Sequence, residues 1–215
     1  MIKGAIFDMD GTVADSENLV YQAYSELMKE YGITITSEEY GSFVGGTNSV
    51  AEYLHEKHDL PLTLQELVDK KKARVDELLM SVKPMPYALE AIDFFASRNF
   101  LMALATSTNK DQTMMKLKAL NIMDKFLAVH AFEDIENHKP HPEIYLKSAR
   151  AIGLNPEECL AFEDTVRGVK AAKAAGCFTI AIPNNFTTHL DFSEADQVFG
   201  DFSEALEFIK SNLLD

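Results

Sequence analysis

The stretch GAIFDMDGT, residues 4–12, decides the fold of this chain. Its first four residues form a short apolar run that ends at polar turn residues, which predicts a buried strand. Asp8 and Asp10 follow directly, although Asp suits strands poorly and a buried charge is costly unless it is paired or metal-bound. An Asx-turn at Asp10-Gly11 explains the two acids about equally well when the stretch is taken alone. The rest of the chain decides between these interpretations.

Length and charge set the frame for that decision. The chain has 215 residues, 47% of them hydrophobic and 25% charged, which is enough for one sizeable core or two small ones. Its formal net charge is −14, which argues against nucleic acid and against anionic membrane surfaces as partners. An anionic small-molecule substrate would therefore need a local cation to bind.

Targeting signals and cysteine usage point to the cytoplasm. The first apolar run stops at Asp8, too short for a signal-peptide core, and no apolar stretch approaches the length of a membrane span. Cys159 and Cys177 lie in or beside apolar segments and lack a CxxC spacing, which indicates reduced core thiols. We expect a cytoplasmic monomer.

From residue 100 onward, short apolar runs alternate with helical patterns. The predicted strands end at polar residues, and the helix after the strand at 160–162 closes at Gly176, a residue typical of a helix C-terminus. Such alternation predicts an α/β fold, a Rossmann-like parallel sheet covered by helices on both faces. The predicted strands are 4–7, 100–105, 127–130, 160–162 and 178–182.

Residues 15–82 have a different pattern, because every periodic segment in them is helical. Two capping boxes, at Thr36 and Thr63, start predicted helices there. We therefore expect an all-helical cap domain at 15–82, inserted into an α/β core domain formed by 1–14 and 83–215. The two connections between the domains could act as a hinge.

Polar side chains gather at the predicted carboxyl ends of the strands, where parallel sheets bind ligands. Each has an ordinary explanation when taken alone: Thr106 beside a helix cap, Lys139 in a solvated loop, and the acids after the strand at 160–162 as a helix cap. Their joint occurrence in this order is poorly explained by chance. The residues are Asp8, Asp10, Thr106, Lys139, Glu163 and Asp164.

These motifs resemble those of the haloacid dehalogenase-like (HAD) hydrolase superfamily, in the branch that contains β-phosphoglucomutase and small sugar-phosphate phosphatases. The similarity covers essentially the whole chain, including the helical cap. It rests on four motifs in order: DMDGT (8–12), ATS (105–107), HKPHP (138–142) and FEDTVRG (162–168).

The resemblance implies phosphoryl transfer with Mg²⁺ as cofactor. Asp8 is expected to be the nucleophile that forms an aspartyl-phosphate, and Asp10 the general acid and base. The expected phosphate-binding residues are Thr106, Ser107 and Lys139. The metal is expected to bind the carboxylates of Asp8 and Asp164 and, as the resemblance alone implies, the main-chain carbonyl of Asp10, with Glu163 in an outer position.

The cap is expected to select the substrate through the loop residues Gly45, Gly46, Thr47 and Asn48. Related mutases place there an arginine that grips a second phosphate, and a histidine where this chain has Val20. Both departures favour a phosphatase acting on a small phosphorylated metabolite, with a sugar phosphate as the expected substrate. Two alternatives stay open: a β-phosphoglucomutase-type mutase, and a catalytically silent regulator that binds a phosphorylated metabolite.

Overall fold

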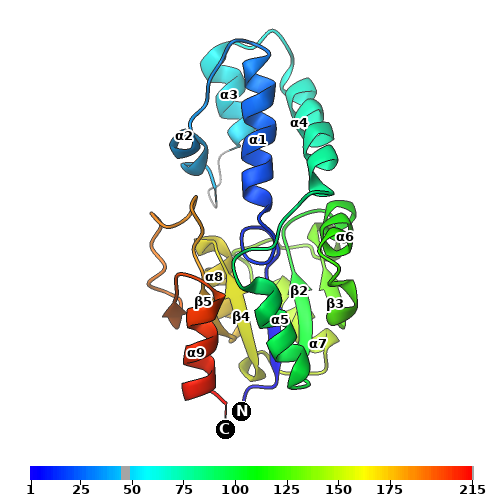
Figure 1. Ribbon diagram of the computed structural model, residues 1–215, viewed down its shortest axis with the longest axis vertical. Coiled ribbons are helices and arrows are strands. Elements are labelled where there is room, and N and C mark those ends of the chain that lie inside the picture. Colours follow the sequence, from blue (N-terminus) through cyan, green and yellow to red (C-terminus); the bar gives the residue numbers. More distant parts are fainter. Residues whose placement is uncertain (45–48, 215) are drawn as a thin grey trace.

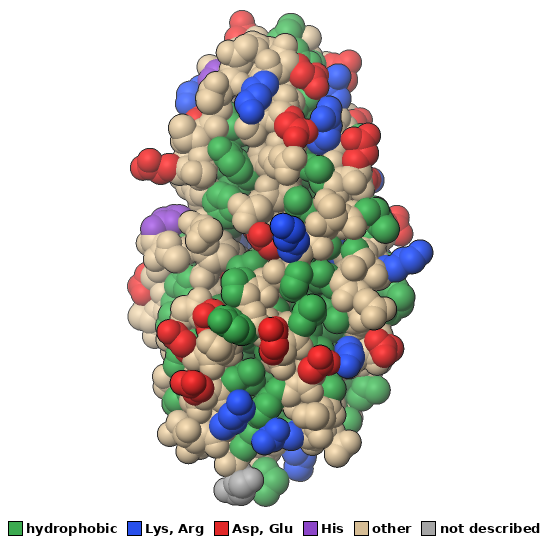
Figure 2. Space-filling model, viewed as in Figure 1, with side chains coloured by type: hydrophobic (Ala, Val, Ile, Leu, Met, Phe, Trp, Pro, Cys, Tyr) green, Lys and Arg blue, Asp and Glu red, His purple; other side chains and the backbone are tan. Residues whose placement is uncertain are grey.

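The computed structural model describes residues 1–44 and 49–214. Figure 1 shows helices gathered at one end of the molecule and a sheet flanked by helices at the other, with the N-terminus at the far end of the sheet-bearing part. Acidic side chains lie over both parts on the face shown in Figure 2. No helix among the described residues combines the length and the apolar character needed to cross a bilayer.

The sheet is parallel throughout, with the strand order β3-β2-β1-β4-β5-β6. In its register Phe7 pairs with both Leu104 and Phe162. The residues that follow β1, β2 and β4 therefore emerge side by side, on either side of the switch point where the strand order reverses. The strands are β1 (Gly4–Phe7), β2 (Leu101–Ala105), β3 (Ala128–His130), β4 (Cys159–Glu163), β5 (Phe178–Ala181) and β6 (Gln197–Val198).

Helices cover both faces of the sheet, which confirms the predicted α/β class. One apolar cluster joins the sheet to α5 (Ala88–Ser97), α6 (Lys110–Ala119) and α9 (Phe202–Asn212). A second cluster joins the other face to α7 (Glu143–Ala151) and α8 (Val166–Ala175). Single-turn 3-10 helices lie at Met123–Lys125, Phe132–Asp134 and Pro156–Glu158.

The helical part consists of α1 (Ser16–Lys29), α2 (Ser37–Gly41), α3 (Val50–His58) and α4 (Leu64–Leu79), and the described residues of 15–82 contain no strand. The Thr63 capping box forms in both directions, and at Thr36 the side chain accepts from the amide of Glu39. The helices enclose a cluster of their own that includes Leu27, Met28 and Leu54.

Two chain segments connect the helical part to the sheet-bearing part, and they run side by side. The amide of Asp15 donates to the carbonyl of Lys83, and the amide of Met85 donates to the carbonyl of Val13, each at 2.9 Å. These paired connections lie close to the predicted boundaries at 14/15 and 82/83. The division of the chain into two domains at those positions stays a prediction.

Candidate active site

Asp8, the first residue after β1, is one corner of a buried ion-pair network. Lys139 Nζ lies 2.6 Å from Asp8 Oδ1 and 2.6 Å from Glu163 Oε1, and it also donates to the carbonyl of Ala105 at 3.0 Å. The Tyr145 hydroxyl donates to the same Glu163 oxygen. Burial alone would lower the pKa of Lys139, but the carboxylates of Asp8 and Glu163 raise it. Lys139 therefore stays charged and holds two acids from neighbouring strands together.

Asp164, the residue after β4, is fixed through both of its carboxylate oxygens. Oδ1 accepts from the Thr12 hydroxyl at 3.2 Å, and Oδ2 accepts from the Asn184 side-chain amide at 2.7 Å. Gly11 lies directly beside it in the left-handed region, with φ +76°, and a Cβ there would stand 2.2 Å from Asp164 Oδ2. Only glycine therefore allows the DMDGT turn to approach this carboxylate so closely.

The acids at this edge of the sheet fit a divalent cation. Carboxylate oxygens of Asp8, Glu163 and Asp164 all lie within 4.8 Å of one another. Burial raises the pKa of Asp8 and raises that of Asp164 well above its usual range, and the neighbouring acids add to both shifts. Carboxylate oxygens are the ligands that Mg²⁺ prefers, and a bound Mg²⁺ ion would offset this excess of buried negative charge.

Asp10 points into a different set of contacts from those of Asp8. Its carboxylate accepts from the hydroxyls of Ser16, Thr106 and Thr108, the last two at 3.2 and 2.6 Å, and forms an ion pair with Lys116. Burial by itself would raise the pKa of Asp10, but Lys116 and the hydrogen bonds from Ser16 and Thr108 lower it to about 2. Two acids of the same turn are therefore held in opposite electrostatic environments.

A cavity of about 290 Å³ opens over these groups, between the two parts of the molecule. From the sheet side it is lined by Asp8, Asp10, Thr106, Lys139 and Asp164, together with the exposed Ser107. The helical side contributes an apolar wall with two charged groups, Glu17 and Lys71. The residues of that wall are Ser16, Glu17, Val20, Val44, Lys71, Val75 and Leu79.

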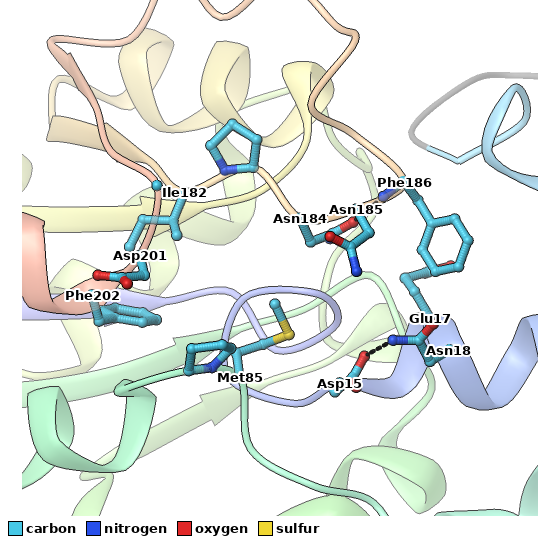
Figure 3. A pocket seen from close by; sticks show the side chains of 13 residues that line it. Asp15, Glu17, Asn18, Met85, Ile182, Asn184, Asn185, Phe186, Asp201 and Phe202 are labelled. Carbon is cyan, nitrogen blue, oxygen red and sulfur yellow. Dashed lines mark hydrogen bonds between the residues drawn. The ribbon is translucent and has the colours of Figure 1, made fainter. Parts of the chain in front are cut away.

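A second hollow of about 200 Å³ lies beside the connecting segments and shares Glu17 with the first. Figure 3 shows its walls: Asp15 and Asn18 at the start of α1, Met85 on the second connection, and Asn184 and Phe186 on the loop after β5. Asn184 separates this hollow from Asp164, to which it is hydrogen-bonded.

The structure brings together the residues that the motifs predict: Asp8, Asp10, Thr106, Ser107, Lys139, Glu163 and Asp164 line the cavity or contact residues that do. Their roles in catalysis and binding stay predictions. The expected specificity residues Gly45, Gly46, Thr47 and Asn48 lie outside the described residues.

Sequence reasoning missed Lys116, Thr108, Tyr145 and Asn184. A signal for Lys116 does exist, because Thr113, Lys116, Leu117 and Leu120 lie at i, i+3, i+4 and i+7 on the buried face of one helix. A lysine at a core position demands a buried anionic partner. For Asn184, which lies in a loop, the sequence offers no comparable signal.

Comparisons with known proteins agree with this geometry. The profile of a family described as haloacid dehalogenase-like hydrolase matches residues 5–182. The phosphorylated carbohydrates phosphatase of Thermotoga maritima is 35% identical over 181 residues, 81% of this chain and 82% of that protein.

Two solved structures extend the likeness to the whole fold. The CbbY protein of Rhodobacter sphaeroides in complex with phosphate has a TM-score of 0.79 at 27% identity, covering 95% of this chain and 96% of its own. A β-phosphoglucomutase of Clostridium difficile has a TM-score of 0.76 at 26% identity, covering 98% and 96%.

Proposed function

The chain belongs to the haloacid dehalogenase-like hydrolases and is a phosphoric monoester hydrolase, and from this premise we propose that it is a Mg²⁺-dependent phosphatase of a small phosphorylated metabolite. The observation that carries the proposal is that two acids of one turn line the same cavity and have separate sets of partners. Asp8 faces the metal-fitting cluster and Lys139, whereas Asp10 faces hydroxyl groups and Lys116 across the same cavity.

Asp8 is the nucleophile in this proposal. Its carboxylate attacks phosphorus, the bond to the leaving oxygen breaks, and an aspartyl-phosphate forms. The low pKa of Asp10 leaves it ionised in the free site, so it must take up a proton when the substrate binds. Asp10 then gives this proton to the leaving alkoxide and later takes one from the water that hydrolyses the aspartyl-phosphate, which restores the Asp8 carboxylate and releases phosphate. Thr106, Ser107 and Lys139 hold the phosphate oxygens.

A Mg²⁺ ion bound by the Asp8 and Asp164 carboxylates and the Asp10 carbonyl would reduce the repulsion between carboxylate and phosphate. Glu163 would support the site from outside, since its carboxylate is engaged by Lys139 and Tyr145.

The cap-side wall supports a sugar phosphate as substrate. Glu17 and Lys71 offer an acceptor and a donor on a surface that is formed mainly by valine and leucine side chains. A polyhydroxylated chain can satisfy both charged groups through its hydroxyls. The phosphorylated carbohydrates phosphatase of Thermotoga maritima, to which this chain is similar, supports the same substrate class.

The cellular setting is proposed on similar grounds. Cys159 and Cys177 are both buried free thiols, which supports a reducing, cytoplasmic environment. We propose a monomer acting on a small molecule, without nucleic acid or membrane as partner.

The proposal is tested with purified protein and a panel of phosphorylated metabolites, with release of inorganic phosphate as the readout. We expect release from sugar phosphates in Mg²⁺, none in EDTA, and recovery when Mg²⁺ is restored. Ca²⁺ should inhibit, because it prefers longer bonds and more ligands. Full activity in chelator would contradict the metal site, and no phosphate release from any substrate would contradict the phosphatase.

A phosphomutase is the second candidate, and Lys71 is the observation that favours it. This lysine lines the cavity from the cap side, where a mutase needs a cation to grip a second phosphate. Incubation with β-glucose 1-phosphate, Mg²⁺ and a trace of the 1,6-bisphosphate separates the two. We expect inorganic phosphate as the main product, and rapid formation of glucose 6-phosphate with little phosphate release would establish the mutase instead.

A further inference from the structure

The loop that follows β5 contacts both halves of the molecule. Figure 1 shows it rising from the sheet toward the helical part beside α2. Within the loop, Asn184 reaches the metal-fitting cluster through Asp164, while Phe186, two residues later, is a member of the apolar cluster enclosed by the cap helices. One short segment therefore contacts both the candidate metal site and the cap core.

The contact at Asn184 has a defined direction. Its Oδ1 accepts from the amide of Phe186 at 2.9 Å, and because that amide can only donate, Nδ2 must face the other way. Nδ2 donates to Asp164 Oδ2 at 2.7 Å and lies 3.4 Å from the carbonyl of Gly11. The side chain thus links the backbone of Phe186 to a carboxylate that would bind the metal.

The contact at Phe186 is a narrow attachment to the cap. Its ring meets Tyr40 edge-on at a centroid distance of 5.2 Å and Tyr21 at 6.0 Å, and it packs over Gly41. Hollows of about 200 and 650 Å³ lie on its two sides, and both are lined by Phe186. Figure 3 shows the ring reaching toward the first turn of α1. The ring is therefore an aromatic anchor flanked by open space.

The segment between the two contacts is internally rigid. The amide of Asn184 donates to the Thr187 hydroxyl, and the amides of Thr187 and Thr188 donate back to the carbonyl of Asn184, at 2.9 to 3.0 Å. Asn184, Phe186 and Thr187 are all buried. A turn locked by its own hydrogen bonds moves as a unit, so a displacement of Phe186 reaches Asn184.

We propose that Asn184 and Phe186 are positioning residues that couple metal binding to the placement of the cap. Asn184 orients the Asp164 carboxylate for Mg²⁺ binding. Phe186 fixes the position of Asn184 relative to the cap helices. By linkage, a bound metal then favours the cap position seen here, and the docked cap favours metal binding. This coupling rests on the proposed metal site.

The test measures Mg²⁺ affinity by calorimetry, without substrate. Asn184→Ala should weaken binding by about 10- to 100-fold, as expected for a group that orients a metal ligand. Phe186→Ala should weaken it by roughly five- to tenfold, at the lower end of couplings between sites. The double variant should bind as weakly as Asn184→Ala alone, because both changes break one chain of contacts.

Matched variants separate coupling from general damage. Phe192→Ala removes a buried ring of the same chain segment that packs on Val169 and Ala181 of the core, so it should leave Mg²⁺ affinity unchanged. Phe186→Leu keeps an apolar anchor and should restore most of the affinity. Equal losses in the Phe192 and Phe186 variants would overturn the proposal.

A measurement on the unmodified protein avoids any dependence on variants that fold poorly. Mg²⁺ should slow amide hydrogen exchange in α2, which carries Tyr40 and Gly41, although the ion would bind at the other end of the loop. Mg²⁺ binding without this protection overturns the coupling and leaves the phosphatase intact. If the unmodified protein binds no Mg²⁺ at all, the metal site itself is wrong, and the coupling with it.

Discussion

The two walls of the candidate active-site cavity differ in how their polar groups are held. On the sheet side, Asp8, Asp10 and Asp164 are each fixed by at least one charged or hydrogen-bonded partner on another element. On the cap side, Glu17 is hydrogen-bonded, among the described residues, only to Tyr40 of the same helical part, and Lys71 is only half-buried. Groups that carry out chemistry must be pre-organised, whereas groups that select among substrates need only be complementary to them. The difference therefore predicts catalytic effects on one wall and selective effects on the other.

Asp8→Asn, on the sheet side of the cavity, should have the largest effect on catalysis. Removal of the proposed nucleophile should lower kcat by roughly 10⁴-fold or more, the scale seen when a member of a concerted catalytic unit is lost. The near-isosteric amide should leave the fold intact. Phosphate release is measured beside Asp124→Asn, which alters an exposed acid and should change nothing. Substantial activity in pure Asp8→Asn protein would exclude the covalent mechanism.

Lys116→Met tests whether the function of Asp10 depends on its ion pair with Lys116. We expect kcat for alkyl phosphates to fall about 100-fold, since a slightly misplaced catalytic group costs that much. The loss should be far smaller for p-nitrophenyl phosphate, whose leaving group needs no proton. Lys118→Met alters an exposed lysine of the same helix and is the control. Equal losses on both substrates would argue against a role through Asp10.

Lys71→Met tests the selective wall. A hydrogen bond from a charged donor is worth about 1.5 kcal/mol, so KM for the preferred substrate should rise roughly tenfold while kcat changes little. The exposed Lys70 is next to it in sequence, and Lys70→Met should behave like the unmodified protein. A fall in kcat as large as that expected for Lys116→Met would contradict the prediction that the cap side affects substrate selection rather than catalysis.

Glu17→Gln should have the smallest effect and a distinctive pH dependence. Burial raises the pKa of Glu17, against an opposing hydrogen bond from Tyr40. As pH falls through that raised pKa, Glu17 gains a proton and accepts substrate hydroxyls less well, so KM should rise a few-fold, and Gln should remove this dependence. KM is measured across the pH range for both proteins, and parallel profiles would contradict the assignment.

The same shift has a consequence for stability. Because the folded-state pKa of Glu17 lies above its ordinary value of 4.5, its contribution to stability is complete below that value and is lost as pH rises through the folded pKa. Glu17→Gln should therefore gain thermal stability relative to the unmodified protein as pH rises. A difference that does not change with pH would contradict the shift.

The sheet could be predicted because its strands are apolar runs closed by polar residues, and the helical insert because its helices start at capping residues. Two elements were not predicted from the sequence. One is β6, which is only two residues long. The other is α9, although Asp201 caps it and its buried face is formed by Phe202, Ala205, Leu206 and Ile209. Isolated short strands leave no periodic signal, whereas α9 shows that a clear amphipathic pattern can still be passed over.

The site divides in the same way. Asp8, Thr106 and Asp164 follow strands directly, so the sheet alone brings them together. Lys116 and Asn184 reach the same place from the interior of a helix and from a loop, and their positions depend on how those elements pack. The local pattern of apolar residues does not specify how a helix or a loop packs against the sheet. The positions of Lys116 and Asn184 therefore became known only from the structure.

The paired connections have a consequence for how this architecture can change. Chain leaves the sheet-bearing part at Ala14 and returns at Pro84, and these two residues bridge to each other. The core itself holds the two ends of the inserted segment next to each other, so this closure does not depend on how the inserted helices pack. The helical segment can thus be replaced by an insert of different shape, provided that the new insert offers an apolar surface against which the ring of Phe186 can pack.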